Sequence, residues 1–140
     1  MAVPCFLNLT DETCYRTHFE NNYCKAPIMT YDGIAVRFRK KDFDHCCFQS
    51  SLRNSDKDTF SIPRAIRLDW IRFVLQNRDA PKYQGWNKKK RCHDPDRRVA
   101  LEGNYIVVIA MISDTKANFI TAYPAEQYAI NLVKKGPKWA

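Results

Sequence analysis

The sequence predicts an α+β domain, and two observations lead to this fold class. The first is an apolar run at residues 105–112, which is rich in β-branched side chains, has the length of a strand and shows no helical period. The second is the order of the patterns, because helical periodicities and one early strand precede a meander of strand-like segments. With 140 residues, of which 45% are hydrophobic, the chain is expected to form one domain over residues 1–140.

The first 30 residues are expected to form a helical segment, with one helix at residues 10–24. Thr10 supplies a capping hydroxyl, and the carboxylates of Asp11 and Glu12 favour the positive end of the helix dipole. Three aromatic side chains then recur at intervals of four residues, which places them on one helix face: Tyr15, Phe19 and Tyr23. We expect this face to dock on the core.

An early strand is predicted at residues 34–38, after a turn at residues 31–33. Its apolar side chains alternate with Ala35 and Arg37, as in a half-buried strand with a basic outer face. Residues 40–53 fit neither the helical nor the strand period for long. We interpret that segment as a short helix or an irregular turn.

The clearest helix of the chain is predicted at residues 62–76. Ser61 is a good N-cap, and Pro63 is tolerated in the first helical turn. The apolar stripe of this helix is expected to pack across the sheet and consists of Ile66, Trp70, Phe73 and Val74.

The C-terminal half predicts an antiparallel meander, with the apolar run as its central strand. Strand patterns occupy three segments: residues 98–101, 105–112 and 119–123. In the last segment, strand alternation places Thr121 and Tyr123 on one face and Ile120 and Ala122 on the other. A short helix at residues 125–134 is expected to follow.

Positive charge is concentrated in one part of the chain, residues 82–98. This segment holds seven basic residues against Asp94 and Asp96, so it carries +5 of the net charge of +8. Such a field suits a polyanion such as nucleic acid, although a solvated loop that maintains solubility is an equally simple interpretation. The candidate RNA-binding residues are the basic run and two neighbouring aromatic rings that can stack on bases: Lys88, Lys89, Lys90, Arg91, Tyr83 and Trp86.

The cysteines and the missing motifs predict that no cofactor is used. Six cysteines without a secretion signal are expected to be reduced thiols, and the adjacent pair Cys46-Cys47 has no framework spacing around it. No dinucleotide-binding, phosphate-binding-loop, CxxC or HExxH pattern is present. A zinc site is an alternative, but its ligands would match no compact spacing: Cys5, Cys14, His18 and Cys24.

The hydropathy pattern predicts a cytoplasmic protein with no membrane contact. No run of the sequence approaches the roughly 20 apolar residues that span a bilayer, and the N-terminus lacks a signal-peptide pattern.

The chain contains the side chains that metal-independent RNA cleavage requires. That reaction needs a base for the 2′-hydroxyl, an acid for the 5′-oxygen, and cations or donors around the phosphoryl oxygens. His45 supplies an imidazole for proton transfer, and five further side chains can neutralise or donate to a phosphate: Lys57, Arg64, Arg98, Thr121 and Tyr123. The simpler interpretation is that these are ordinary strand residues and solvated cations.

Several segments, in this order, resemble a known nuclease superfamily. They are YDGIAVRF, HCCFQSS, KDTFSIPRAIRLDWI, the stretch from KYQGWNKKK to RRVAL, NYIVVIAMI and NFITAYPAE. Together they are similar to phage- and mobile-element-associated members of the barnase, EndoU, colicin and RelE-like (BECR) superfamily. The resemblance implies N-terminal helices packed on a four-stranded antiparallel sheet, with a nuclease core at residues 31–140. It also implies a toxin-like ribonuclease that forms 2′,3′-cyclic phosphates without a metal.

The resemblance also assigns roles to individual residues. His45 would be the general acid or base, Arg64 and Arg98 would hold the scissile phosphate, and Thr121 and Tyr123 would complete the pocket. Lys57 would add a further cation. The implied partners are RNA, with transfer RNA as one candidate, and an immunity protein or a host nucleoprotein complex.

Two positions depart from the pattern of that superfamily. Gln49 stands where an acidic residue is expected, and Cys47 stands where an aromatic residue is usual. This departure favours a second hypothesis, a catalytically inactive relative that binds RNA or blocks a nucleoprotein complex. A third hypothesis is a partner-binding protein with no nucleic-acid role.

Overall fold

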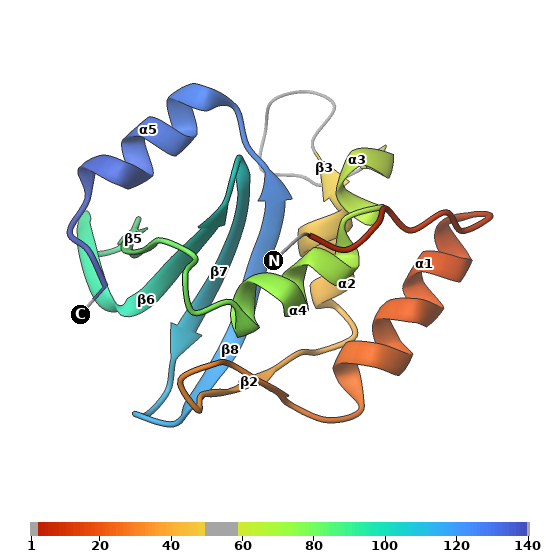
Figure 1. Ribbon diagram of the computed structural model, residues 1–140, viewed down its shortest axis with the longest axis horizontal. Helices are drawn as coiled ribbons and strands as arrows, with labels where there is room; N and C mark the ends of the chain where they lie inside the picture. The colour runs from red at the N-terminus through yellow and green to blue at the C-terminus, as the bar shows by residue number, and fades with distance from the viewer. Residues whose placement is uncertain (1–2, 50–58, 140) are drawn as a thin grey trace.

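A six-stranded sheet organises the chain, with its strands in the order β1-β2-β8-β7-β6-β5 (Figure 1). The computed structural model describes residues 3–49 and 59–139. The strands of this sheet are β1 (Ile28–Met29), β2 (Ala35–Arg37), β5 (Lys82–Asn87), β6 (Cys92–Glu102), β7 (Tyr105–Met111) and β8 (Lys116–Pro124). A separate short pair is formed by β3 (Phe48–Gln49) and β4 (Thr59–Phe60).

The helices lie on both faces of the sheet, so the predicted α+β class is confirmed. They are α1 (Glu12–Phe19) with a π-helical turn η1 (Glu20–Cys24), α2 (Asp42–Cys47), α3 (Ile62–Ala65), α4 (Leu68–Gln76) and α5 (Gln127–Lys135). In Figure 1, α1 and α4 lie on one side of the strands and α5 lies on the other. None of the helices in the described parts of the chain is both long enough and apolar enough to span a bilayer.

Within the described residues the sheet has six strands rather than the four that the family resemblance implied. The long strands β5 to β8 form an antiparallel meander, and the short strands β2 and β1 extend it beyond β8. β2 runs parallel to β8, with Val36 opposite Ala117. The nearly 80 residues between these two strands include α2, α3, α4 and most of the meander, so no local pattern marks this pairing.

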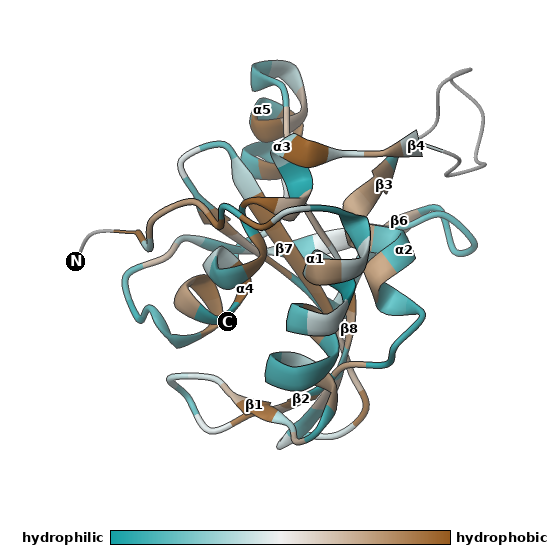
Figure 2. Cartoon of the chain, turned by 90° about the vertical axis from the view of Figure 1, so that its right-hand side faces the viewer, coloured by the Kyte–Doolittle hydropathy of each residue, from teal (hydrophilic) through white to brown (hydrophobic). Residues whose placement is uncertain are grey.

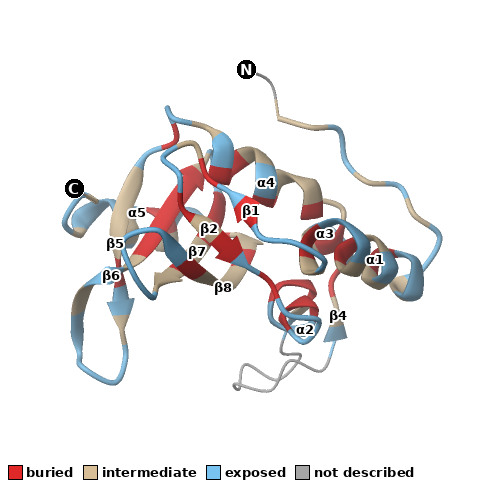
Figure 3. Cartoon of the chain, turned by 90° about the horizontal axis from the view of Figure 1, so that it is seen from below, coloured by how far each residue is buried: buried red, intermediate tan, exposed pale blue. Residues whose placement is uncertain are grey.

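As predicted, the apolar strand β7 lies in the middle of the sheet, and the structure shows that it is buried on both faces (Figure 2). Tyr105, Val107 and Ile109 face the helices α1 and α4, whereas Ile106 and Val108 face α5. Strand residues alternate between faces, so two cores form on one sheet. The buried residues run along the middle of the sheet, and the turn between β5 and β6 is exposed (Figure 3).

The first helix forms where the aromatic spacing predicts it. Tyr15, Phe19 and Tyr23 are all buried, which confirms the predicted docking face. The N-cap is Asp11 rather than Thr10, because the Asp11 side chain accepts a hydrogen bond from the Cys14 N–H at 2.9 Å. The widened π turn keeps the Tyr23 ring stacked 5.5 Å from Phe19.

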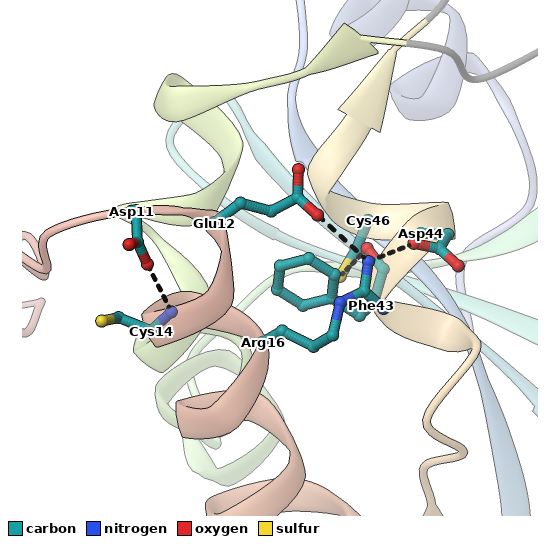
Figure 4. Close-up of polar contacts among 7 residues, drawn as sticks. All are labelled: Asp11, Glu12, Cys14, Arg16, Phe43, Asp44 and Cys46. Atoms are coloured by element: carbon teal, nitrogen blue, oxygen red, sulfur yellow. Dashed lines mark hydrogen bonds and ion pairs between the residues drawn. The ribbon is translucent and has the colours of Figure 1, made fainter.

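Arg16 joins α1 to α2 (Figure 4). Its guanidinium lies 4.5 Å above the Phe43 ring and donates to Asp44 Oδ1 at 2.9 Å and to Glu12 Oε2 at 3.5 Å. Residues 42–47 therefore form a helix rather than an irregular turn, because their apolar side is packed under α1.

The predicted long helix is divided into α3 and α4 at residues 66–67. The N-cap is confirmed, since the Arg64 N–H donates to Ser61 Oγ at 3.4 Å. The break shifts the helical phase, so the buried face of α4 consists of Leu68, Ile71, Val74 and Leu75. Of the predicted stripe, Val74 is buried, whereas Ile66, Trp70 and Phe73 lie half-buried at its margin.

We expect Phe119→Ala to lower the free energy of unfolding by about 4 kcal/mol. Phe119 is 0% exposed and stacks on Phe38 at 4.6 Å, so truncation leaves a cavity between β2 and β8. Urea denaturation followed by circular dichroism measures the change. The control is Ile112→Ala at a position that is 64% exposed, and it should change stability by less than about 0.5 kcal/mol. Equal effects of the two variants would contradict the packing described above.

Candidate nucleic-acid interface

A groove lies between the sheet and α5, and we call it the α5 groove. One cavity of about 290 Å³ is lined by Trp86, Lys88, Arg97, Thr121 and Tyr123, among others. It adjoins a cavity of about 660 Å³ that shares Trp86, Lys88 and Tyr123 with it and extends to Lys135 on α5. The groove therefore brings part of the basic segment to the end of β8.

Gly85 makes room for one of the cations of the groove, Arg97. The pairing of β5 with β6 slips at Gln84 and Gly85, and the stem of Arg97 crosses β5 above the glycine. A Cβ at Gly85 would lie 2.5 Å from Arg97 Cγ, so only glycine leaves room for this path. Arg97 Nε is buried and has no hydrogen-bond partner within the described residues.

Trp86 presents an open aromatic surface in the groove. Its ring meets the edge of His93 with centroids 5.2 Å apart at 83°, and the residue stays 52% exposed. An indole that is positioned by His93 and still exposed to solvent is suited to stacking on an unpaired base. Tyr83 does not join it, since this half-buried ring packs with Ile130 and the other apolar residues on the α5 side of the sheet.

The remaining predicted RNA-binding residues lie at the tip of the β5–β6 hairpin. Lys89 and Lys90 are exposed, and Asn87 Oδ1 accepts hydrogen bonds from their backbone N–H groups at 3.0 and 3.1 Å. Arg91 is exposed and adopts a φ of 51°, which closes the turn. The tip therefore extends the positive field beyond the Lys88 end of the groove.

A second irregularity exposes the end of β8 to the groove. Val108 pairs with Thr121 and Ile109 pairs with Phe119, so Ile120 is an extra residue in β8. Thr121 and Tyr123 line the groove, and Ala122 is buried on the opposite face of the sheet, which α1 and α4 cover, as predicted. The prediction for Ile120 is wrong, because the bulge turns it towards the same cavity as Thr121.

The structure brings four of the six predicted catalytic residues together beside β8. Thr121 Oγ1 donates to the backbone oxygen of His45 at 3.1 Å, which ties the strand to α2. The Arg64 guanidinium lies 5.1 Å from the centre of the Tyr123 ring and donates to the backbone oxygen of Phe48 at 3.2 Å. Three separate elements, α2, α3 and β8, thus meet at one end of the groove.

Tyr123 is a hydrogen-bond donor at neutral pH. Burial raises the pKa of the Tyr123 phenol above its usual value of 10.0, and the nearby Arg64 charge lowers it by less. The hydroxyl therefore remains protonated and can donate to an anionic oxygen.

The structure does not bring Arg98 to this group. Arg98 is 1% exposed and lies on the face of the sheet opposite α5. There its Nη1 donates to Asp32 Oδ2 at 3.0 Å. Its guanidinium also lies near the rings of Tyr31 and Trp139, at 5.6 and 6.0 Å. Consecutive strand residues point to opposite faces, so its neighbour Arg97 reaches the groove instead.

The signal that could have identified Arg97 is its strand phase. Arg97 has the same strand phase as Val99 and Leu101, which pack under α5. Arg98 has the phase of Ala100, which belongs to the core under α1 and α4. Lys57, the sixth predicted catalytic residue, lies outside the described residues.

The zinc alternative receives no geometric support. Within residues 3–49 and 59–139, no three His, Cys, Asp or Glu side chains gather as metal ligands. His18 Nε2 is hydrogen bonded to Asp69 Oδ1 at 2.8 Å, which links α1 to α4.

We expect Asp32→Asn to lower the free energy of unfolding by about 2 kcal/mol at pH 7, because it leaves the Arg98 charge buried without a carboxylate. Burial alone would raise the pKa of Asp32, but the hydrogen bond from Thr30 and the Arg98 charge outweigh it and hold this pKa below 3.8. The ionised Asp32 carboxylate therefore stabilises the fold at any pH above 3.8. This contribution is lost as the pH falls through the depressed pKa of Asp32.

Thermal unfolding between pH 2 and 7 tests this interpretation. The difference between wild type and Asp32→Asn should be full at pH 7 and should shrink below about pH 4. Asp96→Asn removes an exposed carboxylate and serves as the control, and it should change the stability little at any pH. A difference that stays constant down to pH 2 would exclude the ion pair as its cause.

Comparison with known proteins identifies no relative: no family model matches the chain, and neither a curated protein nor a solved structure matches it. The function is therefore argued from the α5 groove itself.

Proposed function

We propose that the protein binds single-stranded RNA in the α5 groove and cleaves it without a metal ion. The supporting observation is that one cavity is lined by an exposed indole, two cations, a hydroxyl and a protonated phenol: Trp86, Lys88, Arg97, Thr121 and Tyr123. These groups match an unpaired base, a sugar and a phosphate, in a field dominated by positive charge.

In the proposed reaction the 2′-hydroxyl attacks the adjacent phosphorus and the bond to the 5′-oxygen breaks. The exposed His45 imidazole takes the proton from the 2′-hydroxyl or gives one to the departing 5′-oxygen, and solvent water exchanges the proton at the other oxygen. Arg64 and Arg97 neutralise the phosphoryl oxygens, and the Tyr123 phenol donates a hydrogen bond to them. The products are a 2′,3′-cyclic phosphate and a free 5′-hydroxyl.

Thr121 has a positioning role in this proposal. Its hydroxyl proton is already donated to the His45 backbone, so it holds α2 against β8 rather than contacting the phosphate. A Thr121→Val variant would therefore act through the position of His45.

A second candidate function is RNA binding without cleavage. It is favoured by the burial of Arg98 with Asp32, because this removes one of the phosphate-binding cations that the family resemblance implied. The groove retains its stacking surface and Lys88 and Arg97 in either case.

Incubation with transfer RNA and total RNA in EDTA separates the two functions. We expect wild-type protein to form cyclic phosphate ends and Tyr123→Phe to do so about 100-fold more slowly. His45→Gln should be impaired to a similar degree. The matched control is Tyr128→Phe, at a tyrosine that is 67% exposed on α5, and it should cleave like wild type. Salt-sensitive binding by a wild type that leaves RNA intact would support the second candidate instead.

We expect Gly85→Ala to weaken RNA binding about tenfold while the fold is retained, because the new methyl group displaces the Arg97 stem. Fluorescence anisotropy with labelled single-stranded RNA at several salt concentrations measures the loss. Arg97→Gln should lose a similar affinity and show a shallower salt dependence.

The double variant Gly85→Ala with Arg97→Gln completes the cycle. It should bind no more weakly than Arg97→Gln alone, since both changes remove the same contact. Additive losses would show that Gly85 does not act through Arg97.

A further inference from the structure

A second positively charged cavity lies at the β2 edge of the sheet, away from the α5 groove. We call it the β2 pocket. It has a volume of about 360 Å³ and forms where the chain leaves the π turn η1 and where β2 ends. Its lining comes from residues 23–27 and residues 37–40, so it shares no residue with the groove. In the sheet, β8, β7 and β6 separate β2 from β5.

The charges that line the β2 pocket are of one sign. Among the described residues that line it, none is acidic and four are cationic: Lys25, Arg37, Arg39 and Lys40. Arg39 is engaged, because Asp42 accepts from its backbone N–H at 2.8 Å and from Nη2 at 3.3 Å. The other three are exposed and form no salt bridge with any carboxylate in the described parts of the chain.

The floor of the β2 pocket adds no negative charge. Tyr23 and Phe38 are buried aromatic residues, and their rings lie 5.1 Å apart. Burial raises the pKa of the Cys24 thiol to about 11, and the charges of Glu20 and Asp42 add to the shift, so the thiol stays neutral. Glu20 and Asp42 act on Cys24 from outside the lining, and three cations without a salt bridge still surround a concave, partly apolar surface, which favours an anion there.

We propose that the β2 pocket binds a phosphate group, with the Arg37 guanidinium donating in fork geometry and Lys25 and Lys40 acting as point charges. Arg37 is the most specific of the three, since a guanidinium matches two phosphate oxygens at once. The phosphate is a terminal group of a small molecule or part of a nucleic-acid backbone, and both present the same oxygens. The inference does not depend on cleavage in the α5 groove.

Backbone amide NMR titrations test the proposal directly. The probes are pyrophosphate, adenosine diphosphate, and single-stranded oligonucleotides of about 4 and about 16 nucleotides. We expect saturable shifts at Lys25, Ala26 and residues 37–40 that are separate from shifts at Thr121 and Tyr123. Saturation by pyrophosphate or the nucleotide identifies a small-molecule phosphate. Saturation only by the longer oligonucleotide identifies a nucleic-acid backbone.

Two adjacent lysines provide a matched pair of variants. Lys40 lines the pocket and Lys41 does not, although both are exposed and carry the same charge. For whichever probe saturates the site, Arg37→Gln and Lys40→Gln should weaken binding about tenfold, and Lys41→Gln less than about twofold. Equal losses for Lys40→Gln and Lys41→Gln would mean a general charge effect and would overturn the proposal. The absence of saturable shifts at residues 37–40 with all probes would also overturn it, whatever the α5 groove does with RNA.

Discussion

The alternation of side chains along β6 is the constraint on which the rest of the structure depends. One face of β6 packs against the core under α1 and α4, and the other face packs against α5. The position of a residue along β6 therefore decides which surface its side chain belongs to. Arg97 and Arg98 are adjacent in the chain but belong to different surfaces. One supplies a cation to the α5 groove, and the other is buried and forms an ion pair with Asp32.

The buried Arg98 connects three distant parts of the chain. Asp32 belongs to the turn before β2, and Trp139 belongs to a C-terminal segment that pairs with the edge of β5. That pairing includes hydrogen bonds from the Gln84 N–H to the Pro137 oxygen at 2.8 Å and from the Trp139 N–H to the Lys82 oxygen at 2.9 Å. A buried cation without its carboxylate would be strongly unfavourable, so these contacts belong to the stability of the fold rather than to an exposed binding site.

Local departures from regular structure shape the α5 groove. The slip at Gly85 lets the Arg97 stem cross β5, and the extra residue Ile120 adds an apolar side chain to the wall beside Thr121. Both departures lie in strands of the antiparallel meander, and sites built on strands are held more precisely than sites on loops. Cationic side chains also gather at the β2 pocket, so they cluster on two separate surfaces.

The predicted interface could be derived from the sequence only in part. Thr121 and Tyr123 were placed on the correct face, because strand alternation is a local property. The contact of Thr121 with the His45 backbone and the position of Arg64 over Tyr123 depend on how α2 and α3 pack beside β8. The burial of Arg98 could not be read from the sequence, because it required the strand phase of β6 relative to both cores.

By itself the sequence determined the elements whose signal is a short period or a local cap. The buried face formed by Tyr15, Phe19 and Tyr23, the Ser61 N-cap and the central position of the apolar strand β7 all follow from side-chain spacing within a few residues. Only the tertiary structure decided the parallel pairing of β2 with β8, the break between α3 and α4, and the burial of Arg98 with Asp32. These features join segments far apart in the chain, and the free energy that favours them comes from packing and charge pairing that no local pattern contains.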